Sequence, residues 1–168
     1  MIHVCSLARL HATVAETKAR HVVTLLRLVE RVERPALVAP KNHLVLAVDD
    51  IVAEAEGYTA PARDHVRRLI DFVGTWDRGA PMVVHCFAGI SRSTAGAFVA
   101  ACVLNPARDE LEIAQAIRCA SRTAQPNARI VAIADDMLGR EGRMIRAVEH
   151  IGPGQAATEG VPFRLDIA

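Results

Sequence analysis

The chain has 168 residues, a formal net charge of +1 and 51% hydrophobic residues. A chain of this length buries about two thirds of its unfolded surface in one core, so we expect residues 1–168 to form a single domain without a metal or disulfide scaffold. The near-neutral charge favours neither nucleic acid nor a membrane as a partner.

Short apolar runs alternate with segments of helical period along the first half of the chain. Strands are predicted at residues 2–7, 21–26 and 43–48, with a helix over 12–20 and a helical turn over 28–34. The stretch 50–60 has no clear period and reads as a loop. A helix then follows, with Thr59 as its cap, Pro61 in its first turn and Gly79 at its end.

The second half begins with a short buried strand at residues 82–85 and continues as helices over 92–104, 109–120, 126–138 and 140–151. Asp109 is a candidate cap. Apolar residues alternate at 163, 165 and 167, which predicts an extended tail. Together the pattern predicts an α/β fold with a central, mostly parallel sheet of four to five strands and helices on both faces. Ligands then bind beyond the carboxyl ends of the strands.

The strand, loop and helix between Pro81 and Leu104 predict an anion site. Successive loop N–H groups and the first helical turn point at one place, and phosphate is the natural occupant. Cys86 ends the strand and Arg92 begins the helix. The guanidinium can hold two phosphate oxygens beside the sulfur, and the same donors would stabilise the thiolate as a nucleophile.

This stretch resembles the signature loop of the cysteine-dependent protein tyrosine phosphatases, most of all the dual-specificity branch. It reads His85-Cys86-Phe87-Ala88-Gly89-Ile90-Ser91-Arg92-Ser93. The resemblance spans about residues 48–94. It implies that Cys86 forms a cysteinyl phosphate and that the loop from Phe87 to Arg92 binds the phosphate oxygens. In the family, the position of Ser93 eases release of phosphate from sulfur, and the position of His85 supports the loop and the thiolate.

The reaction also needs an acid that protonates the leaving oxygen from a separate loop. In the family this acid is an aspartate that follows a strand upstream of the cysteine. The resemblance favours Asp50, with Asp49 as the alternative and Glu54 or Glu56 as further candidates. Asn127 resembles a short element that packs beside the loop in dual-specificity members, and a helix cap is an equally good interpretation.

The four cysteines, at positions 5, 86, 102 and 119, lack Cys-x2-Cys spacing, which argues against a zinc site or a disulfide framework. Cys5 is the one candidate redox partner for Cys86. The N-terminus lacks signal-peptide features, and no stretch reaches the roughly 18 apolar residues of a membrane span. We therefore expect a cytoplasmic protein with no metal or other cofactor.

Phe87, Ala88 and Ile90 stand where phosphoinositide-directed relatives tend to carry lysines. This favours a phosphomonoester on a protein, phosphotyrosine foremost, with phosphoserine or phosphothreonine if the pocket is shallow. Phosphate or another oxyanion should bind in the loop. The alternatives are a phosphatase of nucleotides, sugar phosphates or inositol phosphates, a non-catalytic phosphate-binding module, and a thiol enzyme such as a sulfurtransferase or arsenate reductase. The sequence gives no oligomeric state.

Overall fold

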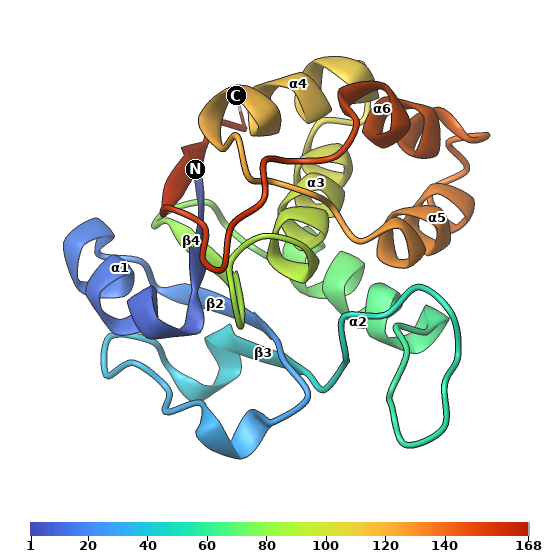
Figure 1. Ribbon diagram of the computed structural model, residues 1–168. Coiled ribbons are helices and arrows are strands. Elements are labelled where there is room, and N and C mark those ends of the chain that lie inside the picture. The colour runs from blue at the N-terminus through green and yellow to red at the C-terminus, as the bar shows by residue number, and fades with distance from the viewer. Residues whose placement is uncertain (168) are drawn as a thin grey trace.

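The computed structural model describes residues 1–167, which form one five-stranded sheet and six α-helices (Figure 1). The sheet order is β3-β2-β4-β1-β5. The strands are β1 (Ile2–Ser6), β2 (His21–Leu25), β3 (His43–Leu46), β4 (Met82–Cys86) and β5 (Phe163–Leu165). Strands β1 to β4 pair in parallel and β5 pairs antiparallel with β1, which confirms the mostly parallel sheet. The extended tail of the sequence prediction is β5.

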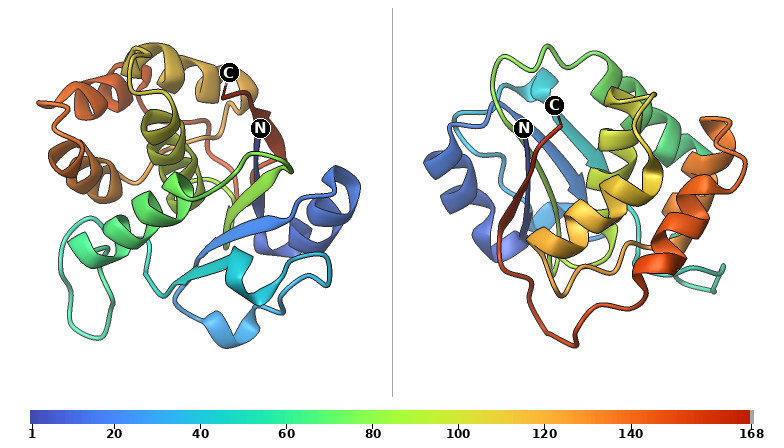
Figure 2. Two further views of the ribbon diagram at one scale, coloured as in Figure 1. Left: turned by 180° about the vertical axis from the view of Figure 1, so that it is seen from behind. Right: turned by 90° about the horizontal axis from the view of Figure 1, so that it is seen from above.

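Side chains of the central strands alternate between two apolar clusters, one on each face of the sheet. The larger cluster contains Val23, Val84 and Cys86 and packs against α2 to α6, whereas the smaller contains Cys5, Val22 and Val83 and packs against α1. Figure 2 shows α1 alone on one side and the other helices on the opposite side. Helices on both faces were predicted, and burial on both sides explains the nearly continuous apolar strands.

The helices follow the predicted order with shifted ends. They are α1 (Leu10–Thr17), α2 (Arg63–Gly74), α3 (Arg92–Leu104), α4 (Glu110–Ala120), α5 (Ala128–Met137) and α6 (Arg143–Ile151), with short 3-10 turns at Leu7–Arg9, Val29–Arg31 and Pro40–Asn42. Asp109 caps α4 as predicted, because its Oδ1 accepts from the N–H groups of Leu111 and Glu112. No helix within residues 1–167 is long and apolar enough to span a bilayer.

The bounds predicted for α2 were wrong at both ends. The helix starts after Ala62, and Thr59 cannot cap it because the backbone of Thr59 is bonded to Asp49 on both its N–H and its C=O. At the other end the helix stops at Gly74 rather than Gly79. The chain then turns so that the Trp76 indole donates to the carbonyl of Ala80 at 3.1 Å.

Helix α3 is the central helix of the larger layer (Figure 1). All its residues from Arg92 to Cys102 are buried, as its apolar character predicted. A Cβ added at Gly96 would lie 3.1 Å from Val84 Cγ1 and 3.2 Å from a Leu25 methyl carbon, so the helix approaches the sheet closely there. This contact fixes the start of α3 against the end of β4, where the predicted anion site lies.

Candidate active site

Cys86 is the last residue of the central strand, and Arg92 is the first residue of α3. The Cys86 side chain is 1% exposed. Its Sγ lies 3.2 Å from Ser93 Oγ and accepts from the Gly89 N–H at 3.3 Å. The sulfur is therefore held at the base of the β4–α3 loop, residues 87–91.

The β4–α3 loop requires glycine at position 89 for two reasons. Gly89 has φ +73°, in the left-handed region that residues with a Cβ rarely adopt. A Cβ there would also lie 2.8 Å from the Cys5 carbonyl carbon and from the Ser6 nitrogen of the neighbouring strand. The loop thus turns tightly against the end of β1, which brings its amides around the sulfur.

Four carbonyl groups of this loop are bonded from outside, each by a backbone N–H of another segment. The acceptors are Phe87, Ala88, Ile90 and Ser91, and the respective donors are Leu7 at 3.1 Å, Gly160 at 2.8 Å, Gln125 at 3.0 Å and Asn127 at 3.3 Å. Carbonyls fixed outward leave the loop N–H groups for the inner side, where an anion can accept from several of them.

The segment between α6 and β5, residues 152–162, contributes one of these donors and is called the strap. A Cβ on Gly160 would lie 2.9 Å from the Gly89 carbonyl oxygen, so strap and loop are in backbone contact. Ser6 Oγ also donates to Glu159 Oε1 at 2.5 Å, which ties the strap to the end of β1. The strap therefore braces the loop from below.

The N-terminus of α3 has no side-chain cap. Ser91 is the N-cap residue, but its hydroxyl donates to Asp50 Oδ1 at 2.6 Å instead of accepting from the first turn. Uncapped N–H groups and the helix dipole favour an anion at this point.

The Arg92 guanidinium supplies charge at the same place. The residue is 8% exposed, and its Nη1 donates to the Val48 carbonyl at 2.9 Å. Its Nε is buried and makes no hydrogen bond within the described chain. A buried guanidinium N–H without an acceptor is costly, so this donor fits a bound oxyanion.

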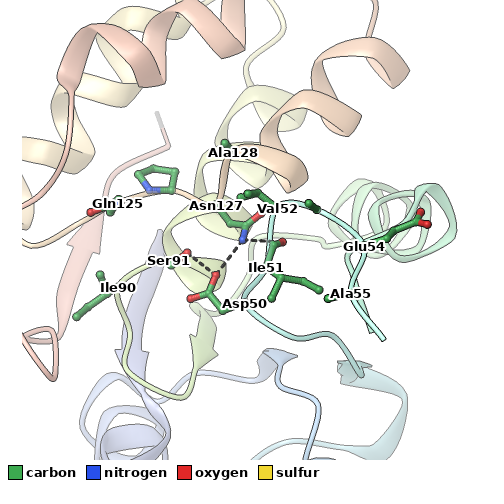
Figure 3. Close-up of a pocket in the computed structure, with 12 residues that line it drawn as sticks. Asp50, Ile51, Val52, Glu54, Ala55, Ile90, Ser91, Gln125, Asn127 and Ala128 are labelled. Carbon is green, nitrogen blue, oxygen red and sulfur yellow. Dashed lines mark hydrogen bonds between the residues drawn. The ribbon is translucent and has the colours of Figure 1, made fainter. Parts of the chain in front are cut away.

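Asp50 is held beside the loop from two sides, as Figure 3 shows. Its Oδ1 accepts from Ser91 Oγ at 2.6 Å and from Asn127 Nδ2 at 2.9 Å, while its Oδ2 lies 4.0 Å from Arg92 Nε. One carboxyl oxygen is therefore fixed by donors, and the other remains toward the guanidinium.

Asn127 performs both of the functions that the sequence left open. Its Oδ1 accepts from the N–H groups of Arg129 and Ile130 at 3.1 Å each, so it caps α5. The same amide donates to Asp50, so the cap also packs beside the loop. Because the cap fixes the amide orientation, Nδ2 must face Asp50.

The other candidate acids lie outside this arrangement. Asp49 Oδ2 accepts from the Thr59 N–H at 2.7 Å and lies 3.5 Å from Arg27 Nη1. Glu54 is 85% exposed and pairs with Arg129 at 3.2 Å. Glu56 is exposed.

A groove of about 720 Å³ opens beside the loop (Figure 3). It is lined by Asp50–Ala55 from the segment after β3, by Ile90 and Ser91 from the β4–α3 loop, and by Gln125–Ala128 from the start of α5. Among these described residues none is basic. The groove begins at Asp50 and Ser91, so it can hold the group attached to a bound phosphate.

His85 lies on the opposite face of the sheet from Cys86. It is fully buried, and its Nε2 is 2.7 Å from Thr24 Oγ1, which in turn lies 2.8 Å from His43 Nε2. Burial lowers the pKa of His85 to about 4, while the hydrogen-bonding backbone of Cys86 acts in the other direction. The imidazole is therefore neutral at pH 7.

Cys5 is poorly placed as a redox partner. It belongs to the smaller cluster, on the α1 face, whereas Cys86 belongs to the larger one. Burial raises the pKa of the Cys5 thiol to about 12, which keeps it protonated and unreactive. A disulfide to Cys86 would require one strand to reverse its alternation.

Sequence reasoning missed three contributors to this site. Gly160 and Gln125 act through backbone N–H groups, which leave no pattern in the sequence. Thr24 carried one available signal, since a hydroxyl in the middle of an otherwise apolar buried strand needs a polar partner.

Comparison with known proteins agrees with this geometry. A family model described as protein-tyrosine phosphatase matches residues 55–128. A search of curated proteins gave no match.

Three solved structures share the fold. Cydia pomonella PTP-2 phosphatase is 18% identical with a TM-score of 0.63, over 80% of this chain and 84% of that one. Human DUSP28 is 19% identical with a TM-score of 0.60, over 83% and 92%. PTPMT1, solved in complex with PI(5)P, is 16% identical with a TM-score of 0.60, over 88% and 94%.

The family match contains both Cys86 and Arg92, and the solved phosphatases share the fold that brings these residues to one loop. The chain therefore belongs to the cysteine-based protein tyrosine phosphatase superfamily.

Proposed function

We propose that this protein hydrolyses phosphomonoesters of proteins through a cysteinyl-phosphate intermediate. The observation that carries the proposal is the convergence of Cys86, Arg92 and Asp50 on one loop, with Arg92 Nε buried and unpaired within the described chain. Nucleophile, anion-binding charge and carboxyl group then stand around a single phosphate position.

In the first step the Cys86 thiolate attacks phosphorus, and the bond from phosphorus to the ester oxygen breaks. Asp50 gives its proton to the leaving alcohol or phenol. In the second step water attacks phosphorus and the S–P bond breaks. Asp50 takes the proton of that water, and the Ser93 hydroxyl, 3.2 Å from the sulfur, stabilises the departing thiolate.

Arg92 and the loop amides act on the equatorial oxygens. In phosphoryl transfer most of the catalysis comes from positioning and electrostatic stabilisation. Outward-bonded loop carbonyls and an uncapped α3 supply fixed donors, which need no rearrangement during reaction. Asp50 is preferred to Asp49 as the acid because Asp49 is bonded to Thr59 and faces Arg27.

The groove favours a protein substrate. Its described lining includes two carboxylates, Asp50 and Glu54, and no basic group, so an inositol or nucleotide carrying further phosphates would meet no compensating charge. A peptide next to a phosphorylated side chain can lie along the apolar part of the groove. Ile90 lines this part.

The test is a substrate panel with the full chain in EDTA. We expect turnover of an aryl phosphate and of phosphotyrosine peptides, with lower kcat/KM for phosphoserine peptides, nucleotides and inositol phosphates. Cys86→Ser should abolish turnover while vanadate still binds. Preference for a metabolite would move the assignment to a small-molecule phosphatase. Binding of vanadate without any turnover by the wild type would indicate a phosphate-binding module.

The intermediate can be trapped with Asp50→Asn and an aryl phosphate whose leaving group needs no proton. The first step should then proceed and the second should stall. Mass spectrometry of the acid-quenched protein should find one phosphoryl group on the peptide that contains Cys86. A phosphoryl group elsewhere would contradict the mechanism.

A further inference from the structure

We infer that Thr24 and His43 are positioning residues for the nucleophile, acting through His85. The inference rests on the proposed function in taking Cys86 as the nucleophile. It concerns two residues on neighbouring strands that touch neither the loop nor the groove. Its basis is a continuous chain of hydrogen bonds beneath the active site.

The sheet register creates this chain. Thr24 of β2 lies directly opposite His85 of β4, and both are fully buried. On the other side of β2, His43 begins β3 at the edge of the sheet and is half-buried. Two contacts of 2.8 Å and 2.7 Å connect His43 Nε2, Thr24 Oγ1 and His85 Nε2 in order.

Hydrogen-bond roles along the chain are mutually dependent, because each neutral imidazole has one donor and one acceptor nitrogen. The backbone of Cys86 favours the protonated form of His85, as an acceptor beside its ring does. A neutral His85 facing this acceptor carries its hydrogen on Nδ1, so its Nε2 must accept from the Thr24 hydroxyl. Thr24 Oγ1 then accepts from His43 Nε2–H.

The consequence is a fixed tautomer at the residue before the nucleophile. With the hydrogen on Nδ1, His85 donates toward the Cys86 backbone and helps to hold the end of β4, from which the thiolate projects. With the hydrogen on Nε2, the buried Nδ1 would face that carbonyl as a second acceptor. Thr24 and His43 prevent this reversed arrangement.

A set of four variants tests the inference. Thr24→Val removes the hydroxyl with little change of shape, and Thr24→Ser keeps it. His43→Leu removes the donor, and His43→Gln keeps a side-chain N–H. His3→Leu is the matched control, since it is another half-buried histidine of the sheet outside this chain of bonds.

The readout is the pH profile of Cys86 alkylation by iodoacetamide, followed by mass spectrometry, together with the acidic limb of kcat/KM. Exposed Cys119 is replaced by serine throughout. Loss of one hydrogen bond corresponds to about 1 kcal/mol, or roughly a fivefold change. We expect Thr24→Val and His43→Leu to move the midpoint upward by about 0.5 to 1 pH unit. Thr24→Ser, His43→Gln and the control should stay within twofold of the wild type.

Other charged groups near the two histidines remain in place in every variant, namely Arg34, Arg92 and His11. Superimposable profiles would overturn the inference, even if the melting temperature falls. A shift in Thr24→Val alone would remove His43 from it. If Thr24→Val fails to fold, the edge-strand pair His43→Leu and His43→Gln decides the question. Alkylation reports on the thiol itself, so failure of the proposed hydrolysis would be seen separately in turnover.

Discussion

Asn127 donates from Nδ2 to Asp50 Oδ1 at 2.9 Å while its own Oδ1 caps α5. The orientation of the proposed acid is thereby coupled to a helix end. Since an aspartate caps helices as well as an asparagine does, the two functions can be separated by one substitution.

We expect Asn127→Asp to retain the wild-type melting temperature within a few degrees but to lower kcat about tenfold. The new carboxylate cannot donate to Asp50, and its charge favours the protonated form of Asp50, so the basic limb of the kcat profile should move to higher pH. Steady-state kinetics from pH 5 to 9 would measure both effects. Asp109→Asn, a cap exchange on remote α4, is the control, and an unchanged profile in Asn127→Asp would contradict the coupling.

Asp50 and Asp49 provide a matched pair. Asp50→Asn should lower kcat on an alkyl or peptide phosphate by about 10² to 10⁴, as expected for loss of a general acid, and should flatten the basic limb. Asp49→Asn should retain most activity, because its carboxylate bonds Thr59 rather than facing the loop. The two variants are compared by kcat and by its pH dependence. Equal losses would mean that Asp49 holds the loop in a way that the acid depends on.

Gly160 braces the β4–α3 loop from the strap. Gly160→Ala places a Cβ 2.9 Å from the Gly89 carbonyl oxygen, so the loop backbone must shift. Overpacking of this kind costs about 1 to 3 kcal/mol, and we expect a tenfold or greater loss in kcat/KM and in vanadate affinity. Gly74→Ala is the control, since nothing lies within 4 Å of its Cβ position. Normal vanadate binding by Gly160→Ala would show that the loop does not need the strap.

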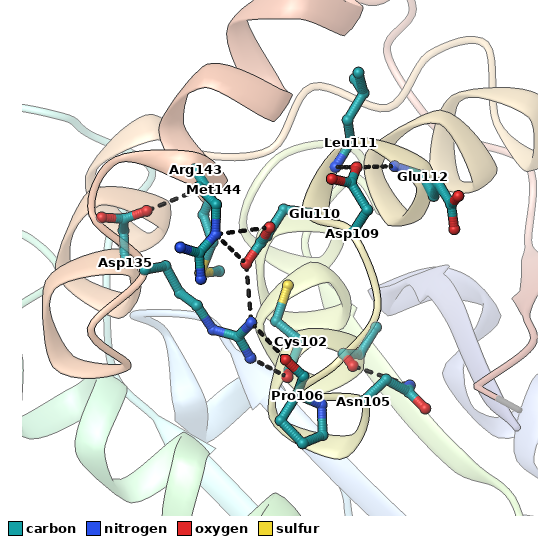
Figure 4. A network of polar contacts seen from close by, with 12 residues as sticks. Cys102, Asn105, Pro106, Asp109, Glu110, Leu111, Glu112, Asp135, Arg143 and Met144 are labelled. Atoms are coloured by element: carbon teal, nitrogen blue, oxygen red, sulfur yellow. Dashed lines mark hydrogen bonds and ion pairs between the residues drawn. The ribbon is translucent and has the colours of Figure 1, made fainter.

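The largest buried charge cluster lies far from the active site, where α3, α4 and α6 meet (Figure 4). Glu110 is 3% exposed and accepts from Arg140 at 2.9 Å and from Arg143 at 3.2 Å. Arg140 also donates to the carbonyls of Cys102 and Pro106. Its charge is buried with that of Glu110, and only Arg143 reaches solvent.

Glu110→Ala should therefore lower the free energy of unfolding by about 3 to 5 kcal/mol, because it leaves Arg140 buried without a counter-ion. Arg143→Ala should cost about 1 kcal/mol or less, since its side chain is 45% exposed. Urea unfolding measures both, and kcat of the folded fraction should not change. A small effect of Glu110→Ala would mean that water enters the cluster.

Buried neutral His85 makes stability fall in acid. Its pKa is about 4 in the folded chain against 6.5 for an unperturbed histidine, so between these values the unfolded state binds more protons. Stabilisation is complete above pH 6.5 and is lost as the pH falls toward 4, by up to about 3 kcal/mol in total. Urea unfolding at pH 7 and pH 5 should show a smaller acid loss in His85→Gln than in the wild type. An equal loss would assign the effect to other histidines.

Much of the fold was predictable because β-branched runs and helical periods are local properties. The strands of the sheet, the burial of α3 and the strand-loop-helix around Cys86 all came from such patterns. The start of α2 was not predictable, because long-range bonds between Asp49 and the Thr59 backbone override the local capping preference of Thr59.

The choice between Asp49 and Asp50 lies beyond sequence reasoning for a similar reason. Neighbouring residues at the end of a strand can point in opposite directions, and only distant partners decide which faces the loop. Here those partners are Thr59 for Asp49, and Ser91 and Asn127 for Asp50. Gly160 was invisible because a backbone N–H belongs to nearly every residue.

The contact between Gly160 and Ala88 also has a consequence for synthesis on the ribosome. Nucleophile, guanidinium and carboxyl group have all been translated by residue 92, yet the brace on the loop emerges some seventy positions later, and β5 closes on β1 later still. A nascent chain should thus remain inactive until its final turn of synthesis, which protects phosphorylated neighbours from a half-made enzyme.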